Sequence, residues 1–157
     1  MKKCLNGFVL LVISIFGHTN KWTYRILDTK DVDMKLLGTS TLDNWEMEAR
    51  SMTGEAQFVV KPDNKSELVS LKNLSFALEV KDLNNETNAP DNNTYKALKS
   101  DGFKYIYHKL VSSAVAHKYK NEHLLKTMGL LTIASVSDEI EMDFRYVANA
   151  NGTITCF

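Results

Sequence analysis

Regular alternation between apolar and polar side chains is the feature that most constrains the fold of this chain. A period of two places apolar side chains on one face of a β-strand and polar side chains on the other. The cleanest run of this kind has apolar residues at Leu74, Phe76, Leu78 and Val80. Shorter runs of similar spacing lie at residues 22–26, 32–36, 45–51, 56–60, 103–110, 130–136, 140–147 and 153–157. These runs predict an all-β, antiparallel domain of the barrel type.

The segments between the runs predict how the strands connect. Residues 28–31 are typical of a turn, so the runs at 22–26 and 32–36 are predicted to pair as an antiparallel hairpin. Residues 137–139 form a connection of hairpin length between two later strands. Residues 93–99 predict a single short helix in this otherwise all-β pattern.

One strand, at residues 103–110, has two faces that are both bulky. Either Tyr105 and Tyr107 face the interior, or Ile106 and His108 do, and the alternation alone leaves the choice open. If His108 faces inward, its ring could form a hydrogen bond with the head group of a bound ligand. The alternative is a core or rim histidine whose hydrogen bonds go to the backbone.

Residues 1–20 differ from the rest of the chain in their order of charged, apolar and polar residues. Lys2 and Lys3 give a positive start, residues 5–16 are mostly apolar, and a short polar stretch follows. This order is typical of a secretory signal peptide, and the apolar run is too short to span a bilayer. We therefore expect a leader at residues 1–20, a β-barrel domain at residues 21–157, and an exported protein, either periplasmic or extracellular.

Charge and composition limit the classes of function that the sequence gives reason to expect. The 19 basic and 19 acidic side chains give a formal net charge of zero, so electrostatics provide no reason to expect a nucleic-acid partner. A hydrophobic content of 44% is ordinary for a globular domain. We find no phosphate-binding loop, nucleophile motif or zinc-protease motif. The sequence predicts neither an enzyme nor a cofactor.

Cysteine and histidine spacing predicts no metal site and no disulfide. Cys4 lies within the leader, which leaves Cys156 without a partner in the remaining chain. His117 and His123 lie in a lysine-rich stretch, and no cysteine or acidic residue stands at metal-ligand spacing from them. Both are interpreted as solvated surface histidines.

Several segments, taken in order, resemble the YceI-like lipid or polyisoprenoid-binding family, in the form found in secreted proteins of Bacteroidetes. Residues 38–45 match a segment that in this family reads Gly-Thr-Ser-Thr-Leu-His-Asp-Trp. Residues 93–99 resemble the short helix of the family, and residues 129–134 and 137–144 resemble two of its later strands. The resemblance runs from about residue 22 to the last residue, and its specificity rests on the order and spacing of the motifs.

The resemblance implies a lipocalin-like barrel with a long apolar cavity for an amphiphile. Two departures accompany it. Asp43 and Asn44 replace the His-Asp pair of the family, so any contact made by that pair is in doubt here. The family fold continues past Phe157 with further strands, so the barrel is expected to be truncated and incomplete at this end. Exposed strand edges would favour self-association, and a homodimer is one expected form.

The apolar strand faces are the predicted ligand site. The residues predicted to line an apolar cavity are Leu36, Trp45, Phe76, Leu78, Ile106, His108, Leu131, Ile133, Met142 and Phe144. The expected function is to hold a lipid or isoprenoid amphiphile without catalysis. The alternative is a structural or protein-interaction domain whose interior is filled by its own side chains.

Overall fold

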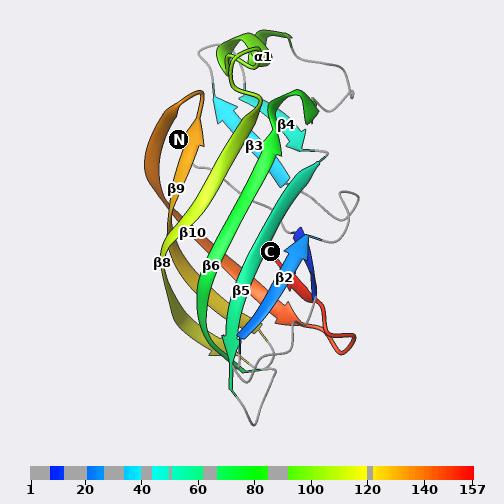
Figure 1. Cartoon of the computed structure of the whole chain (residues 1–157), viewed down its shortest axis with the longest axis vertical. Coiled ribbons are helices and arrows are strands. Elements are labelled where there is room, and N and C mark those ends of the chain that lie inside the picture. The colour runs from blue at the N-terminus through cyan, green and yellow to red at the C-terminus, as the bar shows by residue number, and fades with distance from the viewer. Residues whose placement is uncertain are drawn as a thin grey trace.

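The computed structural model describes residues 8–12, 21–26, 34–39, 44–49, 51–61, 67–84, 92–119 and 122–157. For residues 8–12, 36–39, 44, 45, 117–119 and 122 it describes the backbone only. Within these ranges the chain is almost entirely antiparallel β-structure with one short α-helix (Figure 1). The predicted all-β fold class is therefore confirmed.

Eight of the described strands form a closed barrel in the order β1-β11-β10-β9-β8-β6-β5-β2, and each strand is antiparallel to its neighbours. The long strands β5, β6 and β8 lie side by side along the length of the molecule (Figure 1). The strand bounds are β1 Phe8–Val12, β2 Lys21–Ile26, β5 Met52–Val60, β6 Leu68–Glu79, β8 Tyr105–Tyr119, β9 Glu122–Ile133, β10 Val136–Ala148 and β11 Ile154–Cys156.

A smaller sheet and the helix lie toward one end of the barrel (Figure 1). The sheet has the order β3-β4-β7, with bounds β3 Met34–Thr39, β4 Asn44–Ala49 and β7 Leu83–Asn84. A 3-10 turn, η2 (Val80–Asp82), connects β6 to β7, and the helix α1 spans Asn92–Ala97. The Tyr95 hydroxyl on α1 donates to the carbonyl oxygens of Lys81 and Leu83 at 3.0 and 2.8 Å. The predicted short helix is thus present, and Tyr95 connects it to η2 and β7.

Alternation is directly visible in the burial of β6 and β8. On β6, Leu74 and Leu78 are buried, whereas the intervening Ala77 is only half-buried. On β8, Ile106 is buried and Tyr107 is 50% exposed. The question that the sequence leaves open for residues 103–110 is thereby resolved, because the face with Ile106 and His108 is the inner one.

The predicted hairpin between residues 22–26 and 32–36 is wrong. β2 pairs with β5 and β1, whereas β3 pairs with β4 in the other sheet. The register of β2 on β5 places Tyr24 opposite the fully buried Ala56, so the pairing continues one inner face. Burial of that face, and not closeness in sequence, selects the partner. The predicted turn at 28–31 lies outside the described residues.

The described ends of the family-like segment 38–45 lie in the smaller sheet and not in the barrel. Gly38 and Thr39 end β3, and Asn44 and Trp45 begin β4, so the run belongs to the smaller sheet. Its central residues 40–43 lie outside the described residues.

The turn between β9 and β10 lies three residues earlier than predicted. Ala134 and Ser135 form a two-residue connection with φ values of 47° and 68°. Asp138 and Glu139, predicted as turn residues, belong to β10. Positive φ at both central positions is the geometry that matches the twist of a two-residue hairpin, but it normally selects asparagine and glycine. These residues carry no such signature, which explains the misplaced turn.

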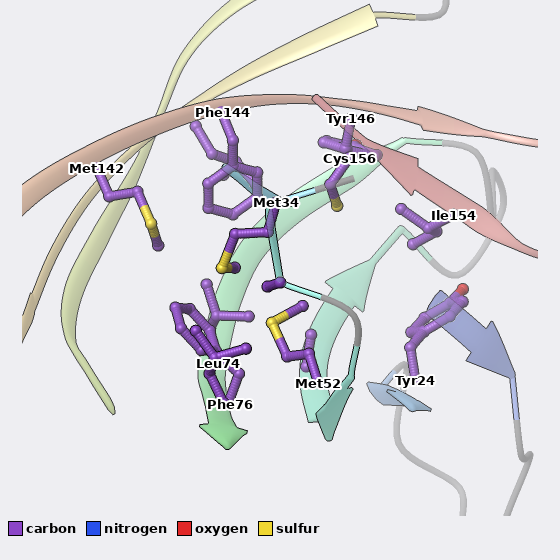
Figure 2. Packing of buried hydrophobic residues seen from close by; sticks show 14 of the residues in the cluster. Tyr24, Met34, Met52, Leu74, Phe76, Met142, Phe144, Tyr146, Ile154 and Cys156 are labelled. Atoms are coloured by element: carbon purple, nitrogen blue, oxygen red, sulfur yellow. The ribbon is translucent and has the colours of Figure 1, made fainter. Parts of the chain in front are cut away.

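The core is one cluster of buried side chains drawn from both sheets. Figure 2 shows Met34 of β3 among side chains of the barrel strands, including Met52, Leu74 and Phe144. Met47 of β4 is also fully buried. Four of the six methionines, Met34, Met47, Met52 and Met142, are buried in this cluster. The smaller sheet therefore fills part of the same interior that the barrel encloses.

Strand β1 lies within the residues that the sequence assigns to a leader. It pairs with β11 on one side and with β2 on the other. The sequence predicts a barrel that lacks part of its wall, and in the whole chain β1 occupies the place between β2 and β11. The removal of residues 1–20 as a leader stays a prediction.

Candidate ligand-binding interior

The predicted lining residues converge on one inner face across β6, β8, β9 and β10. Phe76 lies opposite His108, and His108 lies opposite Leu131, in the registers of β6 with β8 and of β8 with β9. Residues directly opposite in antiparallel strands point to the same side of a sheet. Of the predicted set, six are buried: Phe76, Leu78, Ile106, His108, Met142 and Phe144. Leu131 and Ile133 are half-buried and pack against the core cluster.

Two predicted lining residues stand apart from that face. Leu36 lies on β3 and Trp45 on β4, both in the smaller sheet. Their side chains lie outside the described residues. The burial of Met34 and Met47 shows that this sheet does send side chains into the common core.

His108 is one of the polar residues of this inner face. Its ring stacks on Phe76 with a centroid distance of 4.7 Å and an interplanar angle of 11°. The side chain is only 2% exposed, and neither Nδ1 nor Nε2 has a hydrogen-bond partner among the described residues. Burial lowers the pKa of His108 from 6.5 to about 4, so the ring is neutral at pH 7. A neutral imidazole offers one donor and one acceptor, and both are unused here.

Gly129 makes room for this ring. A Cβ atom at Gly129 would lie 2.0 Å from Nε2 of His108 and 2.8 Å from its Cε1, well inside van der Waals contact. Any other residue at this position would displace the imidazole. Sequence reasoning missed this role, although a glycine inside a strand is a known sign of close approach by another group.

The buried polar residues of the described part of the chain are Ser100, His108, His123 and Thr127, and none of these is a lysine, arginine, aspartate or glutamate. The Thr127 hydroxyl donates to the carbonyl oxygen of Met142. A buried ion without a partner of opposite charge is strongly disfavoured. This interior is therefore suited to neutral groups.

The interpretation of His123 as a surface residue is wrong. His123 is 2% exposed and stacks on Tyr146, with centroids 4.6 Å apart and rings 15° from parallel. The register of β9 on β10 places the two residues opposite each other on the inner face. The period of two that runs through Leu125 and Thr127 also reaches position 123, and that signal could have identified it. The side chain of His117 lies outside the described residues.

Aromatic rings from β2, β5 and β10 contact one another in the interior. Tyr24 meets Phe58 edge-on at 5.4 Å, and Phe58 meets Tyr146 at 5.7 Å. Burial raises the pKa of Tyr146, which keeps its hydroxyl protonated. Self-filling of this kind stabilises a barrel and leaves less space for a guest.

The hairpin of β9 and β10 leaves the inner face partly open. Leu131 lies opposite Asp138, and Ile133 lies opposite Val136, so all four belong to the inner face. Asp138 is exposed, and Val136 is 69% exposed. This half-exposed apolar rim, defined by Leu131, Ile133 and Val136, is about two residues along β9 from the His108 level.

A groove of about 640 Å³ lies along β5, β6 and β8, and its lining includes Phe76 and His108 of the inner face. Its outward-facing lining residues include Thr53, Glu55, Ser75, Ala77, Tyr107 and Lys109. The Asn73 amide donates to Oε1 of Glu55 at 3.1 Å along the same wall. The outward-facing side chains of this groove are mostly polar, whereas Phe76 and His108 belong to the predicted lining set, so the groove is not the purely apolar cavity that the sequence predicts.

Comparisons with models of known families, with curated proteins and with solved structures returned no match to this chain. What the structure defines is the class, an antiparallel β-barrel with an apolar inner face. Within the described ranges, no three histidine, cysteine, aspartate or glutamate side chains are grouped as metal ligands would be. Among the same residues, no helix has the length and hydropathy needed to cross a bilayer.

Proposed function

We propose that this chain is an exported binding protein of the YceI-like type, and that it holds a lipid or polyisoprenoid amphiphile inside its barrel without catalysis. The observation that carries the proposal is His108. A buried donor and a buried acceptor without partners cost about 1–3 kcal/mol, and a hydrogen bond from a guest would relieve that cost. The signal-peptide pattern and the ordered motifs of the sequence support the same reading.

The apolar surroundings of His108 indicate what the rest of the guest is made of. Phe76 on β6 and Leu131 on β9 lie opposite His108, and Ile106 lies two residues away on the same strand. Each CH₂ group of a guest that leaves water for such a surface contributes roughly 0.8 kcal/mol. A prenyl or acyl chain therefore binds through many small contributions, and the imidazole orients its polar end.

The interior also favours a neutral polar end over a charged one. No buried lysine or arginine occurs among the described residues to pair with a phosphate or carboxylate. The ring of His108 is uncharged at pH 7 and provides no compensation. We therefore infer a guest with a hydroxyl, amide or carbonyl head group.

Native mass spectrometry of the uncut chain, expressed so that residues 1–20 are retained, tests the proposal. We expect a bound mass that matches a neutral prenyl or acyl amphiphile. Added polyprenol should bind to the emptied protein at least tenfold more tightly than the corresponding polyprenyl phosphate. Protein that carries no amphiphile and binds neither probe would contradict the proposal.

A pair of neighbouring substitutions on β8 separates the inner site from the outer wall. His108→Leu removes the hydrogen bond to the guest and should weaken polyprenol binding about tenfold, which corresponds to one neutral hydrogen bond. Tyr107→Leu changes the adjacent, 50% exposed residue and should leave binding unchanged. Equal effects of the two substitutions would argue against an interior site.

A second candidate function is a structural or interaction domain with a self-filled core. The placement of Met34 among Met52, Leu74 and Phe144, together with the burial of Met47, favours this candidate (Figure 2). It predicts that neither polyprenol nor polyprenyl phosphate binds. His108→Leu should then change the free energy of unfolding and have no effect on ligand binding. The same two experiments therefore distinguish the candidates.

A further inference from the structure

The closure of the barrel depends on one short strand. β1 has five residues, and three of them pair with β11: Phe8 with Cys156, Val9 with Thr155, and Leu10 with Ile154. On its other side, β1 pairs Leu10 with Ile26, Leu11 with Arg25, and Val12 with Tyr24. The described parts of β2 and β11 are joined in the barrel order only through β1.

Strand parity prevents β2 and β11 from closing the ring in the same way without β1. β1 is antiparallel to both, so β2 and β11 run parallel to each other. Without β1, the seven remaining strands could close the ring only by pairing β2 with β11 in parallel. Every other neighbouring pair in the barrel is antiparallel. Neighbouring strands are about 4.8 Å apart, so the vacated slot is about 10 Å wide and fits one strand.

Both edges of this slot expose groups that need a partner. Tyr24 on β2, and Ile154 and Cys156 on β11, are less than 10% exposed with β1 in place. Removal of β1 would also leave the edge N–H and C=O groups of both strands unpaired. An open edge next to an apolar face is a template for another strand.

We propose that the slot between β2 and β11 is a strand-acceptor site. After removal of the leader, it binds an extended segment of about five apolar residues, antiparallel to both edges. The proposal rests on the export proposed above, because leader removal is what vacates the slot. β1 itself is the occupant that identifies the chemistry, since the sequence Phe-Val-Leu-Leu-Val fills the slot in the whole chain.

A disulfide in the full, uncut chain tests the register of β1. In a Cys4→Ser background, Phe8→Cys places a thiol directly opposite Cys156. Mild oxidation should form an intramolecular bridge in most molecules. Val9→Cys is the matched control, because its register partner is Thr155 rather than Cys156. Equal cross-linking of both variants, or none with Phe8→Cys, would overturn the placement on which the proposal stands.

Exchange of the strand tests the acceptor site itself. A protease site is inserted after Thr19 in the Cys4→Ser chain, and the chain is cut only after it has folded. A fluorescent synthetic peptide of residues 2–14, with Cys4→Ser, should then replace the original segment and comigrate with the protein. The same peptide with Leu10→Pro should bind at least tenfold more weakly, because proline removes a backbone donor and disrupts pairing.

The thiol of Cys156 reports whether the slot is vacant. We expect slow modification in the uncut chain, faster modification after the cut segment is washed away, and renewed protection when the peptide is added. If the washed protein precipitates, the peptide should keep it soluble and the Leu10→Pro peptide should not. Failure of the peptide to bind, protect or solubilise would overturn the acceptor site. That result would leave the polyprenol experiment, which uses the uncut chain, unaffected.

Discussion

At the scale of single residues, His108 brings two free-energy costs to the empty fold. One comes from a buried donor without a partner, and the other comes from a buried acceptor without a partner. His108 is 2% exposed, and neither ring nitrogen has a hydrogen-bond partner among the described residues. The glycine at position 129 removes the one obstacle to its position. A residue that is unfavourable for the empty fold and well placed for a guest is the expected signature of a binding function.

Replacement of His108 by leucine should stabilise the empty protein. Leucine has a similar size and no polar atoms, so the substitution removes the cost of two unsatisfied buried groups. The free energy of unfolding should rise by about 1–3 kcal/mol. Urea denaturation at pH 7 measures this change, and Phe76→Leu serves as a control that removes the stacking partner without the polar atoms. A loss of stability in His108→Leu would show that the imidazole has a partner in the folded state.

The low pKa of His108 predicts a specific dependence of stability on pH. The folded pKa is about 4 and the unfolded value is about 6.5, so the unfolded state binds more protons between these values. Stability from this residue is complete above pH 6.5 and falls as the pH drops toward 4, by about 3 kcal/mol at most. Unfolding of wild type and His108→Leu, compared at pH 7 and pH 4.5, isolates the effect. A constant difference between the two proteins would contradict the assignment.

At the scale of elements, the β9–β10 hairpin bears a local conflict between residue type and backbone. Ala134 and Ser135 both have positive φ, a region that disfavours side chains other than glycine and asparagine. The Thr132 and Ser137 hydroxyls bond to each other at 2.8 Å across the hairpin end and help to hold the register. The turn is imposed by the pairing of the two long strands and not by its own residues.

Residues suited to that turn should therefore stabilise the protein. The double substitution Ala134→Asn and Ser135→Gly should raise the free energy of unfolding by about 1 kcal/mol, because both residues accept positive φ. Asn149→Gly, at a different turn, is not expected to have this effect, since the Asn149 side chain donates to Thr153 and Thr155. The midpoint of urea unfolding provides the measurement. If the free energy of unfolding of the double variant does not rise, the interpretation that Ala134 and Ser135 are strained by positive φ is wrong.

The sequence predicts these strands better than it predicts their partners, because alternation is local and pairing is not. The inward positions of Phe76 and Leu78 follow from their own neighbours in the chain. The pairing of β2 with β5 joins residues far apart in sequence, and it depends on burial that no short window contains. Gly129 illustrates the same limit, since its importance lies in the ring of His108 on the adjacent strand.

At the scale of the whole molecule, stability is expected to be uneven around the barrel. β8 and β9 pair along most of their lengths, whereas β11 has three residues and β1 has five. Three register pairs on each side hold β1 in the seam between β2 and β11, and regions held by such short pairings open before the rest.

Cys156 should report this local opening. It is 1% exposed, and burial raises its pKa to about 12, so the closed protein should react slowly with thiol reagents at pH 8. In a Cys4→Ser background, we expect the opening free energy from labelling to be lower than the global free energy of unfolding. Phe144→Ala, at a core residue on the long strand β10, should lower the global value while changing the labelling value less. Identical free energies would mean that the seam opens only with the entire fold.

The four buried methionines give this interior a chemical character of its own. Thioether side chains are unbranched and polarisable, so Met34, Met47, Met52 and Met142 can adjust their rotamers to guests of different outline while the strands stay in place. The same sulfur atoms are open to oxidation, and a sulfoxide would introduce a polar, chiral group among Leu74, Phe76 and Phe144. Under the proposed function, adaptability toward cargo and sensitivity to peroxide would therefore arise from the same sulfur atoms.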